Sequence, residues 1–164
     1  MAKKGQEIRF KNVNILFKNF RGEERRDPKN NQVVNREGQR TFCIQVDEEE
    51  AEELREIGLK INQTKPNEEY DDILYFLQIE ARFDKYPPEV YMYVGGDCTQ
   101  LNEDTIAILD NRQNKIKIAD IIINASPWQI NDRSGVKAYL TRGDFLIEED
   151  DWQARHNEWL RKED

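Results

Sequence analysis

Arginine side chains gather in one polar stretch near the start of this 164-residue chain. Residues 20–39, FRGEERRDPKNNQVVNREGQ, have almost no apolar periodicity, which predicts a long loop. Guanidinium groups bind phosphates through paired hydrogen bonds. Phe20 stands at the mouth of this loop without an evident core partner, so we predict that its ring stacks on a base. The predicted phosphate contacts are Arg21, Arg25, Arg26, Arg36 and Arg40.

A second group of aromatic and cationic side chains lies in residues 126–147, SPWQINDRSGVKAYLTRGDFLI, which alternate as two strands around a turn. Proteins that bind single strands combine cations that track phosphates with rings that stack on bases. A large ring at a strand start is more often part of a core, and this alternative reading applies to Trp128. The predicted contributors are Trp128 and Tyr139 for stacking, and Lys137 and Arg142 for phosphates.

Signals of catalysis are weak. Gly95 and Gly96 form a lone pair at a turn, without the lysine and hydroxyl residue of a phosphate-binding loop. The only histidine, His156, is far from either cysteine, so we predict no metal site and no cofactor. Adjacent acids could still serve a metal-dependent nuclease, but nothing selects that reading, and we predict a protein that is not an enzyme.

Charge is distributed unevenly along the chain. The net charge is −8, but residues 1–40 hold 11 Lys or Arg against 5 Asp or Glu, a net charge of +6, which leaves −14 for the rest. A basic first quarter on an acidic body favours a localised anionic partner.

No apolar run approaches the ~20 residues of a membrane span, and the N-terminal residues lack the apolar segment of a signal peptide. We expect a cytoplasmic protein without a membrane partner and with reduced cysteines.

The predicted elements are mostly strands. Residues 7–17 alternate with a phase slip at Lys11–Asn12, which predicts a bulge or two short strands, with Val13, Ile15 and Phe17 in one phase. Residues 40–46 predict a strand with Phe42, Ile44 and Val46 on one face. Further strands are predicted over residues 73–83 and 89–94 and from Lys115 to Ala125, and a short helix is predicted after Asn102.

A helix is predicted directly after residues 40–46. Asp47 is the expected N-cap, Glu50 holds the capping-box position, and Gly58 closes the helix. The acidic run 47–53 is therefore helix-terminus chemistry rather than a metal site. Residues 148–164 are predicted to be an acidic, partly helical C-terminal tail.

This order of elements predicts a mostly β or α+β fold. The long first loop, the helix after the second strand and the final hairpin suit a small OB-like β-barrel with one or two short inserted helices and a C-terminal helix. We predict one OB-like domain over residues 1–147, with the long loop at 20–39 and the tail at 148–164.

Four segments resemble a family of small, mostly uncharacterised phage proteins, some of which are labelled single-stranded-DNA-binding-like. The segments are VNILFKNF, NREGQRTFCIQVD, PPEVYMYV and ADIIINASPWQINDRSGVKAYLTRGDFLIEEDDW. The resemblance runs from about Val13 to Trp152, and its most specific part is residues 131–140. Asp132 and Arg133 depart from the family pattern there. The resemblance implies a phage protein in the cytoplasm of a bacterial host.

Together, these observations predict a phage single-stranded-DNA-binding protein of replication or recombination that binds without sequence specificity. The alternative is an acidic protein-interaction module, such as a DNA mimic or an inhibitor of a host enzyme or defence system. The acidic surface or the tail could also contact phage replication or recombination proteins or a host protein. Self-association into a homo-oligomer stays open.

Overall fold

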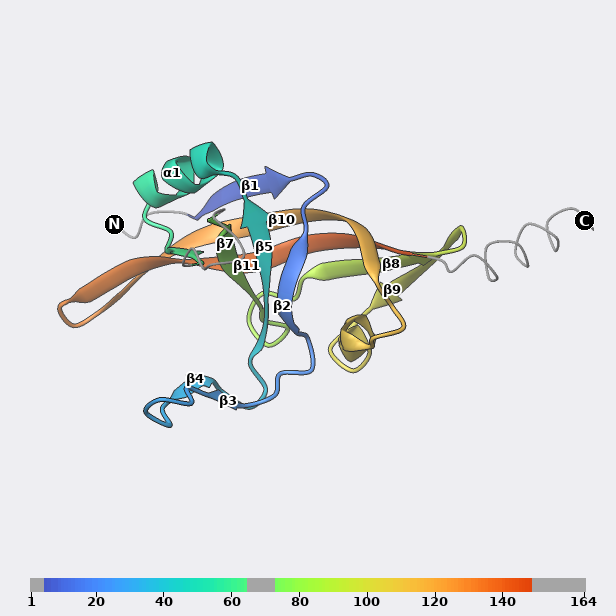
Figure 1. Ribbon diagram of the computed structural model, residues 1–164, viewed down its shortest axis with the longest axis horizontal. Helices are drawn as coiled ribbons and strands as arrows, with labels where there is room; N and C mark the ends of the chain where they lie inside the picture. The colour runs from blue at the N-terminus through green and yellow to red at the C-terminus, as the bar shows by residue number, and fades with distance from the viewer. Residues whose placement is uncertain (1–4, 65–72, 149–164) are drawn as a thin grey trace, which may run out of the picture.

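The computed structural model describes residues 5–64 and 73–148, which form a mostly β structure (Figure 1). This confirms the predicted mostly β or α+β class. Within these residues, the α-helix α1 (Glu48–Glu56) and the 3₁₀-helix η1 (Ile106–Asp110) accompany the strands. The strands are β1 (Gln6–Phe10), β2 (Ile15–Asn19), β3 (Arg25–Arg26), β4 (Val33–Asn35), β5 (Arg40–Val46), β6 (Ile61–Gln63), β7 (Tyr75–Ala81), β8 (Glu89–Val94), β9 (Asp97–Leu101), β10 (Ile116–Ile130) and β11 (Arg133–Ile147).

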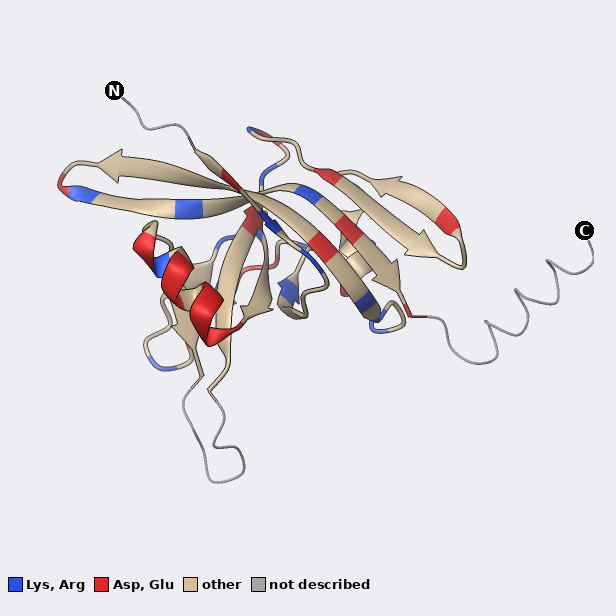
Figure 2. Ribbon diagram, turned by 90° about the horizontal axis from the view of Figure 1, so that it is seen from above, with Lys and Arg blue, Asp and Glu red and all other residues tan. Residues whose placement is uncertain are grey.

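The predicted hairpin is present and longer than expected. β10 and β11 have 15 residues each and pair antiparallel as far as Ile130 and Arg133. Asn131 starts the turn with a φ of 54°, in the left-handed region that asparagine tolerates. The strand predicted to end at Ala125 continues into the hairpin, so the two form one strand. We call residues 126–137 the arm, because this end of the hairpin extends away from the body (Figures 1 and 2).

The main sheet has the order β1-β10-β11-β7-β5-β2. β11 runs parallel to β7, where Tyr139 lies opposite Glu80, whereas the other neighbours in this order are antiparallel. β1 and β2, at the two ends of the order, are consecutive in the chain. Between them, the Val13 N–H donates to the Ala119 carbonyl (3.0 Å) and Asn14 accepts from the Gln45 N–H (3.0 Å). Of the two predicted alternatives, a bulge or two short strands, the chain forms two short strands. Together they contact both β10 and β5.

α1 forms as its sequence predicts. Asp47 Oδ1 accepts from the Glu50 N–H (2.7 Å), and Glu50 Oε1 accepts from the Asp47 N–H (3.4 Å). Ala51 and Leu54 face the core, and Gly58 follows with a φ of 99°. The base of the arm lies beside this helix end, where Leu59 bridges to Val136. The acidic residues of α1 are visible next to the arm in Figure 2.

Within residues 20–39, where a long loop was predicted, two short strands form a small hairpin, and we call the whole segment the loop hairpin. β3 and β4 pair within it. Its base is held by the buried side chain of Asn35, whose amide donates to the Glu23 and Gln39 carbonyls (2.9 Å each). The Thr41 hydroxyl donates to Asn35 Oδ1 (3.0 Å). Polar side chains hold this segment, so its sequence lacks the apolar periodicity that would have predicted it.

The core lies between the long hairpin and strands β5 and β7. Phe42, Ile44 and Val46 project into it from β5, as their alternation predicts. β8 pairs with β11, and the predicted Gly95–Gly96 turn leads into β9, which was not predicted. η1 follows where a short helix was predicted; Asn102 Oδ1 caps the preceding turn by accepting from the Thr105 N–H (3.1 Å).

Apart from Glu148, the predicted tail at 148–164 and its helix lie outside the part of the chain that the structure describes. Neither helix within the described ranges is long and apolar enough to span a membrane.

Candidate nucleic-acid interface

A cleft of about 540 Å³ opens where β5 begins and β7 ends. The two strand ends are adjacent because Arg40 pairs with Ala81 and Thr41 pairs with Glu80. The base of the loop hairpin forms one wall, and Lys137 of the arm forms another. Four cations from three separate parts of the sequence therefore meet in one cleft: Arg36, Arg40, Arg82 and Lys137.

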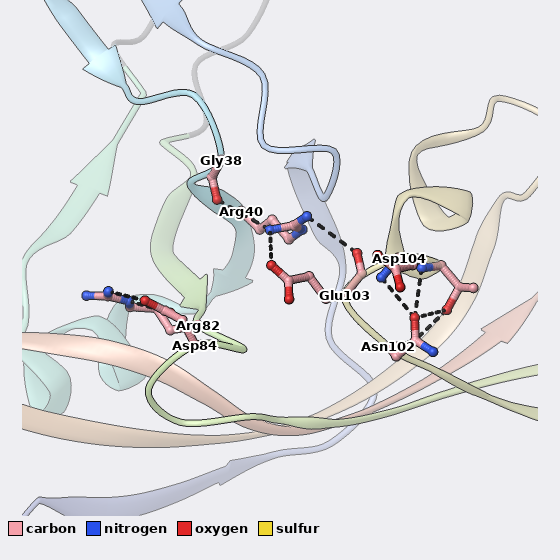
Figure 3. Close-up of polar contacts among 8 residues, drawn as sticks. Gly38, Arg40, Arg82, Asp84, Asn102, Glu103 and Asp104 are labelled. Atoms are coloured by element: carbon pink, nitrogen blue, oxygen red, sulfur yellow. Dashed lines mark hydrogen bonds and ion pairs between the residues drawn. The ribbon is translucent and has the colours of Figure 1, made fainter.

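Arg40 is fixed inside the cleft (Figure 3). Its Nη1 donates to the Gly38 carbonyl (3.4 Å) and lies 3.7 Å from the Glu103 carboxylate, and its Nη2 donates to the Glu103 carbonyl (3.4 Å). The side chain is 20% exposed, and its Nε is buried without a hydrogen-bond partner among the described residues. Hydrogen bonds and an ion pair within the protein thus engage one side of this guanidinium.

Lys137 reaches the cleft from the arm. Its Nζ lies 2.6 Å from the carboxylate of Glu80, a nearly buried acid of β7. The same ammonium lies 5.6 Å from the centre of the Tyr139 ring, and that ring contacts Tyr86 at 5.5 Å between centroids. Tyr86 is 55% exposed. Two neighbouring rings therefore lie beside the Lys137 ammonium, and the Tyr86 ring is largely open to solvent.

Arg82 and Asp84 form the third charged pair of the cleft (Figure 3). Arg82 Nε and Nη2 donate to the two carboxylate oxygens at 3.2 and 2.8 Å. These hydrogen bonds lower the pKa of the Asp84 carboxyl and raise that of the Arg82 guanidinium. The four cations share the cleft with four acids, Glu37, Glu80, Asp84 and Glu103, so an entering phosphate competes with carboxylates for the same donors.

The structure brings three predicted phosphate contacts into the cleft, namely Arg36, Arg40 and Lys137, with Tyr139 next to them. Within the described residues, no hydrogen bond or ion pair engages the guanidinium of Arg36. Arg21, Arg25 and Arg26 lie outside the cleft on exposed parts of the loop hairpin. Arg21 Nη2 donates to Asn111 Oδ1 (2.8 Å), and Arg26 Nε donates to Glu24 Oε1 (2.8 Å).

Phe20 does not stack on bases, because its ring is 0% exposed. It lies against Phe42 at 5.0 Å between centroids and meets Phe145 edge-on at 5.8 Å. The predicted base contact at Phe20 is therefore wrong. The residue anchors the loop hairpin to the core instead.

Trp128 is 40% exposed, which corrects the alternative reading that placed it in the core. β1 pairs with β10 only as far as Ala125, so Trp128 lies beyond the body on the arm. Its indole lies over Gly135 of the opposite strand, where an added Cβ would come within 2.9 Å of the ring. The glycine thus leaves room for a ring that lies flat on the arm.

Arg142 lies away from the cleft and is committed to acids. Its Nε donates to Asp144 (3.0 Å), Glu89 lies within 3.8 Å, and the guanidinium covers the Tyr91 ring at 4.9 Å. The hydrogen bond to Asp144 raises the pKa of Arg142. Asp144 also accepts from the Tyr93 hydroxyl and raises the pKa of that phenol to about 12. These bonds leave Arg142 a weak candidate for phosphate contact.

Sequence reasoning missed Arg82, Phe83 and Tyr86, which lie in or beside the cleft. Their segment, RFDKYPP, alternates cations with aromatic residues directly after a strand, and this composition was a usable signal. Among the described residues, no group of three or more His, Cys, Asp or Glu could hold a metal ion.

The chain matches a protein family described as "Putative phage ssDNA-binding domain" over residues 1–161. No curated protein matches it significantly. Among solved structures, the C-terminally truncated single-stranded DNA-binding protein from bacteriophage Enc34 is similar, with a TM-score of 0.51 and 8% identity over 88% of this chain and 87% of that chain. At this identity, the likeness concerns the fold.

Two further structures of the bacteriophage Enc34 protein match less closely. The protein without truncation gives a TM-score of 0.48 and 9% identity, covering 92% of this chain and 88% of that chain. Its complex with ssDNA gives 0.46 and 11%, covering 92% and 93%.

Proposed function

Since this chain belongs to the family of phage ssDNA-binding domains, we propose that it holds a single DNA strand in the cleft between the loop hairpin and the arm. The convergence of Arg36, Arg40, Arg82 and Lys137 on one cleft carries this proposal. Phosphates replace the carboxylates that pair with Arg40, Arg82 and Lys137 in the free protein. The Tyr139 and Tyr86 rings and the exposed indole of Trp128 offer stacking surfaces for bases.

We also propose that the strands form an OB-like barrel within a domain spanning residues 1–147. Its support is a ring of neighbours: the interrupted strand β1–β2 contacts β5, followed by β7, β11 and β10, which returns to β1. An OB-fold is a five-stranded, partly open barrel that binds oligonucleotides on strands two and three and on the loops after strands one and four. In this chain those parts are β5, β7, the loop hairpin and the arm, and all four border the cleft.

The biological role proposed here is to cover single strands exposed during phage replication or recombination in the host cytoplasm. The cleft contacts backbone charge and base faces, which every nucleotide has, so binding does not depend on sequence. The protein needs no chemical step for this role.

Titration of a fluorescent oligothymidine at low and high salt tests the function. Each neutralised phosphate of a single strand contributes a slope of about −0.7 to log K against log salt, so affinity should fall steeply with salt. Absence of binding at low salt would contradict the proposal. A chain that ignored oligonucleotide but captured a basic host protein would fit the acidic-mimic alternative.

The cleft itself is tested by removing the Lys137–Glu80 pair as a unit. Lys137→Gln with Glu80→Gln leaves no buried carboxylate unpaired, and it should weaken binding and reduce the salt slope by about one phosphate's share. Arg142→Gln is the control, because this arginine, held by Asp144 and Glu89, lies away from the cleft. Equal effects of both variants would place the DNA outside the cleft.

A further inference from the structure

Phe17 in β2 is exposed although its sequence pattern predicts an inner position. Its side chain alternates in phase with Val13 and Ile15, yet it is 58% exposed. The pairing of β2 with β5 is irregular between Leu16 and Asn19, and Phe17 has a φ of 49°. A bulky residue rarely adopts this left-handed conformation, and such strain concentrates at functional positions.

The Phe17 ring reaches across β5 to a second ring. Its centroid lies 5.1 Å from that of Phe76 in β7, with the planes inclined at 56°. β5 separates β2 from β7 in the sheet, so the two rings cover β5 on the face turned away from the core. Leu77 and Ile79 point into the core, and the alternation of β7 therefore places Phe76, Gln78 and Glu80 on the outer face.

Between the rings and the cleft, the described side chains of β5 and β7 on this outer face are uncharged. The β5 residues opposite Phe76 and Gln78 are Gln45 and Cys43. Charge begins again at Glu80, which pairs with Lys137 at the edge of the cleft. Phe76 and Glu80 are four residues apart, about 13 Å along a strand. We call this uncharged strip between the two aromatic rings and the cleft the floor. A base can lie on it without contacting a charged side chain.

A cation flanks the ring pair. Arg25 Nη2 donates to the carbonyl of Lys18, the neighbour of Phe17 (2.9 Å). Its charge also acts on the thiol of Cys43, where it partly opposes the rise in pKa that burial causes. An exposed pair of rings beside an arginine complements a nucleotide, which presents an aromatic base and an anionic phosphate.

We propose that Phe17 and Phe76 form a base-stacking site for a nucleotide of single-stranded DNA, with Arg25 beside the adjoining phosphate. The inference rests on the proposed function and extends the DNA path from the cleft along β5 and β7. Bases face the uncharged floor, and phosphates lie toward Arg25 at one end and Lys137 at the other.

Phe17→Gly tests the site without straining the fold, because glycine adopts a positive φ readily. The variant should bind oligothymidine about five- to hundredfold more weakly, the loss expected for one stacked base. Its salt slope should equal that of the wild type, because no charge is removed. Phe17→Trp should retain the affinity, and Ile118→Ala, an exposed apolar residue of β10, is the control that should not change it.

An abasic oligonucleotide of equal length distinguishes a loss of base stacking from a distortion of the protein. Wild type and Phe17→Gly should bind it alike, since it has no base to stack. A Phe17→Gly variant that loses affinity equally for both oligonucleotides would overturn the stacking site. Unchanged oligothymidine affinity would also overturn it while the proposed function stands, whereas a wild type that binds nothing at low salt would overturn both.

Discussion

The loop hairpin and the arm both border the cleft, but different interactions hold them. The loop hairpin is anchored by side chains: Phe20 lies in the core, and Asn35 bonds to the backbone around it. Its own ladder consists of two residue pairs. The arm continues the ladder of β10 and β11 from Ser126 to Ile130, and Trp128 covers Gly135 on its surface.

This difference separates stability from binding. A change at an anchor of the loop hairpin removes contacts from the core and should lower the stability of the whole fold. A change on the arm lies beyond the core, so it should alter DNA binding with little cost in stability. Three substitutions test this contrast.

Phe20→Ala should have the largest effect on stability. It removes a fully buried ring that packs against Phe42 and Phe145, and such truncations cost about 3–5 kcal/mol in the free energy of unfolding. Urea denaturation followed by circular dichroism measures the loss. If the variant kept native stability but bound DNA weakly, the result would support the base-stacking role of Phe20 that the burial of this ring excludes.

Asn35→Ala should cost less, about 1–3 kcal/mol, because it leaves carbonyls at the partly buried base of the loop hairpin without their donor. The same denaturation experiment measures it. Gln32→Ala, an exposed position of the same hairpin, is the matched control and should stay within about 0.5 kcal/mol of the wild type. Equal losses would mean that the loop hairpin does not depend on the Asn35 anchor.

Trp128→Ala should have the smallest effect on stability, within about 1 kcal/mol, since the half-exposed indole lies outside the core. The comparison with the loop hairpin would fail if this change destabilised the protein as much as Phe20→Ala. Oligothymidine titration of the same variant should show weaker binding if the indole stacks on a base.

Elements set by local chemistry could be predicted from the sequence. Asp47 and Glu50 cap α1 through bonds within one turn, and Asn131 supports its turn through its own backbone preference. The alternation of Phe42 and Ile44 marks the core face of β5. In each case the residues that decide the structure are neighbours in the chain.

Features set by distant contacts could not be predicted in this way. Phe20 is buried because Phe145 of the last strand meets it. Phe17 breaks its alternation at an irregularity of β2, and Trp128 is exposed because β1 stops pairing at Ala125. Arg82 joins the cleft because the end of β7 lies beside the start of β5. These outcomes depend on strand order, which single-residue patterns do not encode.

The unequal burial of the two cysteines offers a route to site-selective labelling. Cys43 is buried in β5, and burial raises the pKa of its thiol to about 11, so it carries almost no thiolate near neutral pH. Cys98 is exposed on β9 and does not line the cleft. A maleimide dye should therefore mark the native protein at one known position, and its fluorescence could report DNA binding without a reactive group beside the DNA.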